Sequence, residues 1–360
     1  MADESTVYAD RLMTLQKEIL GILRTFEFLQ ENLLPGALHE NQARLVSVVG
    51  ATFRNFESNF ASLTPPDDSA AIHQPLCAAM RELGKAFDLF MSKPGPEWTL
   101  AFLHSRGAYC RALYQLYDLR DQLPIVAAHF LLEGAKAPFP NPSSGVETGF
   151  FHRKRNDQCS DSTLYIPENY SPERPIPLII ALHGGYGQGS EYIWTWLRPA
   201  RSRGYAILAP KSWDNTWDMS VPSEDSRSIL RMLEELMAKY SIDASRIYLT
   251  GLSDGGIFTY IFGLEQNQLF RGLAPVAGAL HPAVDPMLRR GVGKDTPLFV
   301  IHGVHDFIFP IAFTRQTSKL LKDIGYNVKY EELPEWGHAY PYSINERMVL
   351  PWFESLPPKK

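Results

Sequence analysis

The 360-residue sequence predicts an α/β domain, with a mostly parallel sheet wrapped by helices, preceded by an all-α helical bundle. Apolar residues recur at spacings of three and four through residues 1–132, as in amphipathic helices. From about residue 148, short β-rich runs alternate with helical segments, which is the pattern of a parallel sheet with crossover helices. Residues 134–147 are rich in Pro, Gly and Ser. We therefore expect a helical domain over 1–133, a linker over 134–147 and the α/β domain over 148–360.

The N-terminal pattern predicts four long helices and a short fifth one. The breaks fall at Pro35-Gly36, at Pro65-Pro66 and at the Lys93–Pro96 turn, and Pro124 opens the short helix. Short loops between long amphipathic helices favour an up-down-up-down bundle. Because the apolar stripes are rich in Phe and Tyr, we expect this domain to act as a cap over the site or as the interface of a homodimer.

The C-terminal pattern predicts seven strands separated by helices. The expected strands are Ser162–Ile166, Pro177–Leu182, Tyr205–Ala209, Arg246–Thr250, Leu273–Val276, Leu298–His302 and Val328–Glu332. The expected helices lie near 191–202, 223–240, 254–265 and 311–325. Unbroken apolar runs such as Leu178–Leu182 suit central strands that are covered on both faces.

Composition excludes several classes of protein. A net charge of −5 gives no basic excess of the kind that nucleic-acid binders carry. No apolar run approaches the length of about 18 residues that a membrane span needs, and the first residues lack the pattern of a signal peptide. Three cysteines are an odd and sparse set, as in a reducing compartment. We therefore expect a cytoplasmic protein with no nucleic-acid partner.

The most informative motif is Gly-Leu-Ser-Asp-Gly-Gly at 251–256, directly after the apolar run Arg246–Thr250. It matches the G-x-S-x-G nucleophile elbow, in which a sharp strand-to-helix turn exposes the serine hydroxyl above the sheet. Ser253 is then the candidate nucleophile. Gly251 and Gly255 are small because strand and helix pass too close there for a Cβ atom.

A glycine-rich loop, His183–Gly187, follows the strand Pro177–Leu182. Acyl transfer requires two N–H groups aimed at the oxyanion of the tetrahedral intermediate. We assign these donors to the backbone N–H groups of Gly185 and Asp254, with Tyr186 as the alternative donor from the loop. The other interpretation is an ordinary glycine turn after a strand.

Two further segments complete a set of groups for nucleophilic catalysis. Asp306 ends the run His-Gly-Val-His-Asp after a predicted buried strand, and His338 follows the last predicted strand. An Asp in this place can orient a histidine, which then acts as general base for the serine. The order Ser253, Asp306, His338 is that of α/β-hydrolases. The competing view is that Asp306 caps a turn and that His338 is a surface residue.

Other residues near these motifs have two interpretations each. The carboxylate of Asp254 either faces the site, where it would disfavour anionic substrates, or points away and complements the dipole of the following helix; we expect the second arrangement. Trp213 and Trp217, together with Tyr186, could form a substrate pocket, or the tryptophans could be core residues. Trp194 and Trp196 are expected to be core residues.

Residues from about 148 to 357 resemble the α/β-hydrolase esterases that include phospholipase/carboxylesterases, feruloyl esterases and polyhydroxybutyrate-depolymerase-like enzymes. The likeness rests on LHGG at 182–185, SIDASRIYLTGLSDGG at 241–256, HGVHD at 302–306 and GHAYP at 337–341. The resemblance implies hydrolysis of small-molecule carboxylic esters, without metal or organic cofactor, through an acyl-enzyme. The alternatives are a peptidase or amidase on the same fold, or an interaction protein that works through its helical domain.

Overall fold

The computed structural model describes residues 4–95, 97–138, 145–357 and 359. The chain divides into two compact units, Met1–Gly134 and Ala135–Lys360. Part of the predicted linker, residues 139–144, lies outside the described residues.

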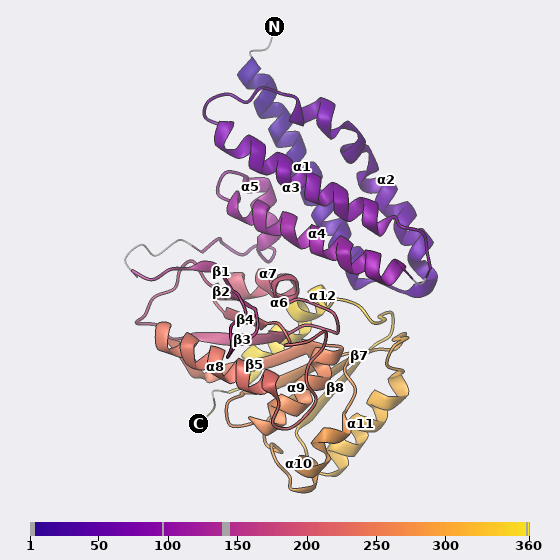
Figure 1. Ribbon diagram of the computed structural model, residues 1–360, viewed down its shortest axis with the longest axis vertical. Helices are drawn as coiled ribbons and strands as arrows, with labels where there is room; N and C mark the ends of the chain where they lie inside the picture. The colour runs from indigo at the N-terminus through magenta and orange to yellow at the C-terminus, as the bar shows by residue number, and fades with distance from the viewer. Residues whose placement is uncertain (1–3, 96, 139–144, 358, 360) are drawn as a thin grey trace. The chain divides into compact units, whose positions relative to one another are not determined.

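The first unit is all-helical, as the apolar periodicity predicts. Its elements are α1 (Glu4–Glu31), η1 (Pro35–Ala37), α2 (Leu38–Phe56), the π-helical turn η2 (Glu57–Ala61), α3 (Ala70–Phe90), α4 (Trp98–Asp118), α5 (Pro124–Ala127) and η3 (Ala128–Phe130). Figure 1 shows α1 to α4 as four long helices that run alongside one another. Helix α4 ends five residues before the expected position, Leu123, and a turn leads from it into α5.

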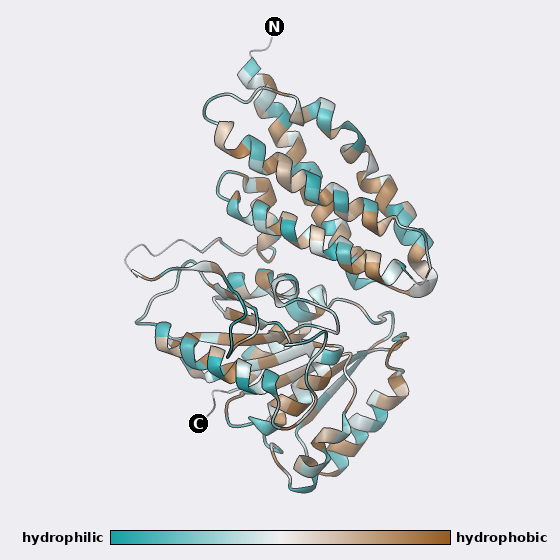
Figure 2. Cartoon of the chain, in the orientation of Figure 1, coloured by the Kyte–Doolittle hydropathy of each residue, from teal (hydrophilic) through white to brown (hydrophobic). Residues whose placement is uncertain are grey.

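Aromatic side chains fill the interior of the first unit. The ring of Phe26 in α1 lies 6.3 Å from that of Phe90 in α3 and 5.4 Å from that of Tyr109 in α4. The Tyr109 hydroxyl donates a hydrogen bond to the carbonyl of Leu23. All four residues are buried, and Figure 2 shows hydrophobic and hydrophilic residues alternating along the long helices. Internal packing thus accounts for much of the Phe and Tyr content that suggested an outside partner.

The second unit contains one eight-stranded sheet in the order β1-β2-β4-β3-β5-β6-β7-β8. The strands are β1 (Gly149–Arg153), β2 (Ser162–Ile166), β3 (Ile176–Leu182), β4 (Ala206–Pro210), β5 (Ile242–Leu252), β6 (Gly272–Val276), β7 (Leu298–Gly303) and β8 (Val328–Leu333). Strands β1 and β2 pair in antiparallel fashion, as do β2 and β4, and the remaining pairs are parallel. The predicted α/β class is confirmed, and all seven expected strands are present. Strand β1 was not predicted, because Gly-Phe-Phe-His-Arg shows no alternation.

Helices cover both faces of the sheet (Figure 1). They are α6 (Gly189–Tyr192), α7 (Trp194–Arg203), α8 (Glu224–Lys239), α9 (Asp254–Glu265), η5 (Pro282–Val284), α10 (Asp285–Arg289), α11 (Ile311–Asp323), α12 (Tyr342–Ile344), the π-helical turn η6 (Asn345–Val349) and α13 (Leu350–Ser355). In β5, Leu249 belongs to the core cluster that includes Ile229 of α8 and Phe258 of α9. The preceding residue, Tyr248, stacks on Phe353 of α13 at 4.4 Å. Successive side chains of one central strand therefore enter two separate cores.

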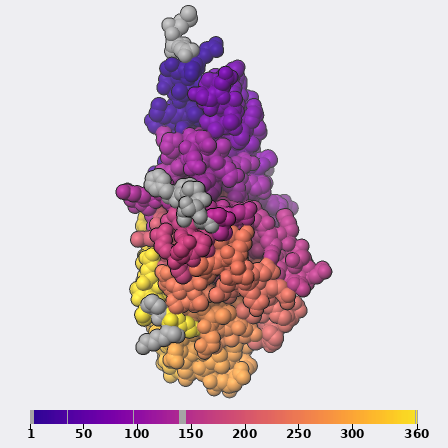
Figure 3. Space-filling model, turned by 90° about the vertical axis from the view of Figure 1, so that its left-hand side faces the viewer, coloured from indigo at the N-terminus to yellow at the C-terminus, as the bar shows by residue number. Residues whose placement is uncertain are grey.

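The helix α13 packs against the sheet through Phe353, which is fully buried, whereas Pro351 and Glu354 are exposed. The described C-terminal segment that includes α12 and α13 reaches the surface of this unit, where it is yellow in Figure 3. Among the described residues, no helix combines the length and the apolar character that crossing a bilayer would require.

Candidate active site

The candidate residues follow parallel strands at one edge of the sheet. Ser253 follows β5, Asp306 follows β7 and His338 follows β8, and each strand in this part of the sheet pairs with a parallel neighbour. Parallel strands bring their carboxyl ends to the same edge, where α/β folds place their ligand sites. The topology therefore brings residues that are far apart in sequence to one rim.

Ser253 occupies a strained strand-to-helix turn. Its backbone has φ 57° and ψ −121°, a conformation that residues with a Cβ atom rarely adopt. The serine N–H donates to the carbonyl of Val276 at the end of β6. A Cβ atom on Gly251 would lie 2.3 Å from the carbonyl oxygen of Gly255. The predicted elbow is therefore present, and the close approach expected at Gly251 is confirmed.

The same turn presses against the glycine-rich loop. A Cβ atom on Gly255 would lie 2.4 Å from the carbonyl oxygen of Leu182 and 2.5 Å from that of His183. One on Gly184 would lie 3.3 Å from the Cβ of Ser253. The absence of side chains at Gly184 and Gly255 is what lets the loop after β3 reach the elbow.

Two backbone N–H groups are available at this junction. Asp254 is the first residue of α9, where an N–H has no partner within the helix. In the described part of the chain, the N–H of Gly185 donates to no protein acceptor. The N–H of Tyr186, by contrast, donates to the carbonyl of Asn215 at 2.6 Å. The alternative assignment of Tyr186 as an oxyanion donor is therefore wrong, because its N–H is already used.

The side chain of Asp254 faces the glycine-rich loop. Its Oδ2 accepts a hydrogen bond from the Thr216 hydroxyl at 2.5 Å, and a Cβ atom on Gly185 would lie 2.6 Å from the same oxygen. This carboxylate oxygen is thus directed towards the loops rather than along its own helix. The expectation that Asp254 points away is wrong, because the 211–217 loop supplies a partner that the sequence pattern does not reveal.

The Lys211–Trp217 loop holds the glycine-rich loop in place through hydrogen bonds to His183. The N–H of Ser212 donates to His183 Nε2 at 3.1 Å, so Nδ1 carries the proton and donates to the carbonyl of Gly184 at 2.6 Å. Complete burial lowers the pKa of His183 to about 3, despite the opposing bond to Gly184, and the nearby charge of Lys211 adds to this effect. His183 is thus a neutral structural imidazole with one defined tautomer.

Trp217 is part of the same support. Its Nε1–H donates to the carbonyl of His183 at 2.8 Å, and its ring lies 4.8 Å from the imidazole and stacks on Phe258 at 5.2 Å. The side chain is 2% exposed. The interpretation of Trp217 as a wall of the substrate pocket is therefore wrong, and the alternative as a core residue holds. Trp194 and Trp196 are also buried, as expected.

Trp213 remains partly exposed and lines a cavity of about 500 Å³. The guanidinium of Arg155 lies 4.2 Å from the centre of its ring. Asn215 and Thr216, which contact the glycine-rich loop and Asp254, line the same cavity. The assignment of Trp213 to the substrate pocket therefore remains a prediction. The same holds for Tyr186, whose side chain is 70% exposed.

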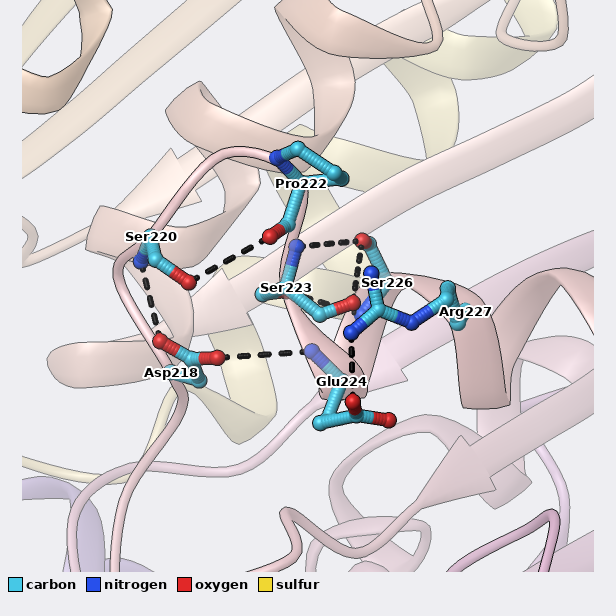
Figure 4. A network of polar contacts seen from close by, with 7 residues as sticks. All are labelled: Asp218, Ser220, Pro222, Ser223, Glu224, Ser226 and Arg227. Carbon is cyan, nitrogen blue, oxygen red and sulfur yellow. Dashed lines mark hydrogen bonds and ion pairs between the residues drawn. The ribbon is translucent and has the colours of Figure 1, made fainter.

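The start of α8 anchors the far end of the loop. Asp225, which is almost fully buried, accepts hydrogen bonds from the N–H groups of Trp213 and Asp218 at 2.8 and 2.7 Å. Figure 4 shows how the chain then enters the helix. The Asp218 carboxylate accepts from the N–H groups of Ser220 and Glu224, and Ser223 and Ser226 form a reciprocal capping box. A rigid helix end thereby fixes the loop on which the glycine-rich loop rests.

Asp306 and His338 meet directly. His338 Nδ1–H donates to Asp306 Oδ2 at 2.8 Å, and the carboxylate has no exposed surface. The other carboxylate oxygen accepts from the N–H groups of Ile308 and Phe309. Burial alone would raise the pKa of Asp306, but hydrogen bonds from His302 and His338, the charge of His338 and the Phe309 N–H outweigh it and hold that pKa well below its usual range. A permanently ionised acid that orients a histidine is the geometry expected of a catalytic pair.

The imidazole of His338 has aromatic neighbours. The rings of Phe309 and Phe307 meet it edge-on at 5.7 and 6.4 Å, and Phe307 is 52% exposed. Among the described residues, no hydrogen bond joins the Ser253 hydroxyl to His338 in this conformation. The structure thus brings Asp306 to His338, and Ser253 to the glycine-rich loop.

Three polar residues of this region were not predicted to be part of the site: His183, Asp225 and His302. Each is buried with hydrogen-bonded partners, and His302 lies beside Asp306. Their common signal is a polar residue at the end of an apolar run or in the first turn of a helix. That signal alone does not distinguish support from chemistry. No group of three or more His, Cys, Asp or Glu side chains able to hold a metal ion occurs within the described residues.

A comparison with protein families gives a match that lies wholly within the second unit. Residues 214–348 match the model of the Phospholipase/Carboxylesterase family. This segment contains the elbow, Asp306 and His338, and the sheet around it has the topology described above. Over this segment the second unit is similar to that family, and its sheet has the mostly parallel α/β topology. The match confirms the resemblance inferred from the motifs.

Several curated relatives of the second unit are esterases by name. A bifunctional acetylxylan esterase/xylanase of Neocallimastix patriciarum is 27% identical over 162 residues, which are 43% of this chain and 22% of that protein. Feruloyl esterase B of Neurospora crassa is 31% identical over 128 residues, 32% of this chain and 43% of the relative. Poly(3-hydroxyalkanoate) depolymerase C of Paucimonas lemoignei is 28% identical over 123 residues, 31% of this chain and 30% of the relative. The chain thus spans less than half the length of each.

Solved structures resemble the chain over similar stretches. A thermostable esterase aligns with a TM-score of 0.48 and 24% identity, over 57% of this chain and 62% of its own. The S-formylglutathione hydrolase of Staphylococcus aureus aligns with a TM-score of 0.49 and 16% identity, over 58% of this chain and 99% of its own.

Proposed function

We propose that the protein is a serine carboxylesterase that hydrolyses small-molecule carboxylic esters, with Ser253 as nucleophile, His338 as general base and Asp306 as the acid that orients His338. The observation that carries the proposal is the bond between His338 Nδ1–H and the buried Asp306 carboxylate, at the same sheet edge as the strained turn of Ser253. The esterase names of two of the relatives support the same reaction class.

The proposed mechanism has two halves. His338 Nε2 takes the proton of Ser253 as the hydroxyl attacks the ester carbonyl, and the N–H groups of Gly185 and Asp254 hold the resulting oxyanion. His338 then protonates the departing alcohol, which leaves an acyl-enzyme. The same histidine activates a water molecule that releases the acid. Asp306 stays ionised throughout and stabilises the imidazolium.

Kinetics of single and double variants test this assignment. Ser253→Ala and His338→Ala should each lower kcat on a para-nitrophenyl ester by about ten-thousandfold or more, and the double variant should be no slower than either single one, because the residues act as a unit. Additive losses, or a Ser253→Ala variant that keeps measurable turnover with unchanged KM, would contradict the mechanism.

The choice between ester and amide substrates needs its own measurement. The same triad can cleave amides when the leaving amine is protonated efficiently. A matched pair, an acyl ester and the corresponding anilide, distinguishes the two activities. We expect kcat/KM on the ester to exceed that on the anilide by a large factor; comparable values would favour a peptidase or amidase.

The helical unit is proposed to act as a cap or as a homodimer interface. The support from its aromatic content is reduced, since Phe26, Phe90 and Tyr109 pack within its own core. The molar mass of the full chain in solution, measured by light scattering across a concentration series, tests the dimer. A mass of one chain throughout would remove the dimer and leave the cap.

A further inference from the structure

A second histidine contacts the candidate triad acid. His302, near the end of β7, has no exposed surface. Its Nε2 lies 3.1 Å from Asp306 Oδ2, the oxygen that also accepts from His338. Asp306 Oδ2 therefore has two imidazole neighbours, the buried His302 and the partly exposed His338.

The tautomer of His302 follows from its neighbours. Nε2 lies 2.8 Å from the carbonyl oxygen of Phe309 and also faces the Asp306 carboxylate. Because both neighbours only accept hydrogen bonds, Nε2 must carry the proton. Nδ1 lies 2.9 Å from the hydroxyl of Thr314, a buried residue of α11, and that hydroxyl donates to it. The Phe309 carbonyl and the Asp306 carboxylate thus fix the tautomer, and the Thr314 hydroxyl adapts to it by donating to Nδ1.

The hydrogen bond from His302 to the Phe309 carbonyl is important because the Phe309 N–H also binds the Asp306 carboxylate. The N–H groups of Ile308 and Phe309 donate to Asp306 Oδ1 at 2.8 and 2.7 Å. His302 therefore contacts the acid at one oxygen and, through the Phe309 carbonyl, the peptide segment that binds the other oxygen. The His302 imidazole thus contacts both the Asp306 carboxylate and the loop that follows Asp306.

We propose that His302 is a positioning residue for the triad, which holds Asp306 in the orientation that directs its Oδ2 at His338, and that the Thr314 hydroxyl holds the His302 ring in place through Nδ1. The inference rests on the proposed function. His302 is fully buried and touches no substrate, so its effect reaches the reaction only through Asp306 and His338.

This role predicts a specific kinetic signature. His302→Leu removes the donor while keeping bulk, so Asp306 rotates and His338 loses its alignment. Misplacement of a catalytic group of this kind lowers kcat by about ten- to a hundredfold, whereas KM should stay within about twofold because ground-state binding is untouched. His302→Gln restores an N–H donor at a similar reach and should recover most of kcat.

A second pair of variants avoids the risk of misfolding. Thr314→Val keeps the shape of the side chain but loses the donor to Nδ1, and it should lower kcat by about three- to tenfold. Ser318→Ala is the matched control. Ser318 is buried on the same helix, and its hydroxyl has no hydrogen-bond partner within the described residues, so kcat should not change. Thermal unfolding of each full-length variant shows whether the fold is kept.

Clear outcomes decide the proposal. Lower kcat at constant KM in His302→Leu, recovery in His302→Gln and a loss in Thr314→Val but not in Ser318→Ala support it. Wild-type kcat in His302→Leu overturns it, as does a Thr314→Val variant that equals Ser318→Ala. If His302→Leu does not fold, the Thr314 and Ser318 pair decides. Wild-type protein without esterase activity would refute the proposed function itself, and this inference with it.

Discussion

The Asp254 carboxylate and the Thr216 hydroxyl form a 2.5 Å hydrogen bond directly beside Gly185. This bond places a carboxylate next to both proposed oxyanion donors, since one donor is the N–H of Asp254 itself. It also ties the Lys211–Trp217 loop to the elbow. A charge in this position should influence which esters react.

Asp254→Asn should broaden the substrate range towards anionic esters. Removing one negative charge near the bound acyl group relieves a repulsion, so kcat/KM for an aryl hemisuccinate should rise by about tenfold relative to the neutral butyrate ester. Parallel kinetics on the two esters measure the ratio. Thr216→Val serves as the control, because it removes the hydrogen bond and keeps the charge; an equal change of the ratio in both variants would mean that charge is not the cause.

Trp217→Phe should act on turnover rather than on substrate choice. The variant loses the Nε1–H bond to the carbonyl of His183, which supports the glycine-rich loop. We expect a loss of about 1–3 kcal/mol in the free energy of unfolding and a lower kcat, with little change in KM across esters of graded acyl length. A KM that depends on acyl length in this variant would instead restore Trp217 as a pocket wall.

The sequence predicts the site best where chemistry and chain order coincide. Ser253, Asp306 and His338 each follow a strand of a recognisable period, so topology alone brings them to one edge. The direction of the Asp254 side chain and the use of the Tyr186 N–H depend on the Lys211–Trp217 loop. Its path is fixed by Asp225 on another element, and no local pattern encodes that contact.

The same distinction applies to the fold. Strand β2 was expected at Ser162–Ile166 and is found there, because Ser-Thr-Leu-Tyr-Ile is itself a β-rich run. The edge strand β1 has no such alternation, and pairing with β2 forms it instead. The burial of Trp217 was equally hidden, since an aromatic residue after a strand suits a pocket and a core alike.

The buried imidazole of His183 should make stability depend on pH. Its folded-state pKa of about 3 lies below the usual value of 6.5, so the stabilisation is present above pH 6.5 and is lost as the pH falls towards 3. Between pH 6.5 and 5, where most carboxylates remain ionised, this residue contributes a slope of up to about 1.4 kcal/mol per pH unit. Urea unfolding of wild type and His183→Asn across this window measures it. Equal slopes in the two proteins would exclude His183 as the source.

The central claim is that Ser253 is an activated nucleophile, and covalent labelling tests it most directly. A fluorophosphonate reacts with a serine hydroxyl only where a general base and an oxyanion site assist the attack. Mass spectrometry of the full-length protein should show one adduct, mapped by peptide sequencing to Ser253. The adduct should be absent in Ser253→Ala and form far more slowly in His338→Ala. An adduct on another residue, or wild-type protein that stays unlabelled, would contradict the account.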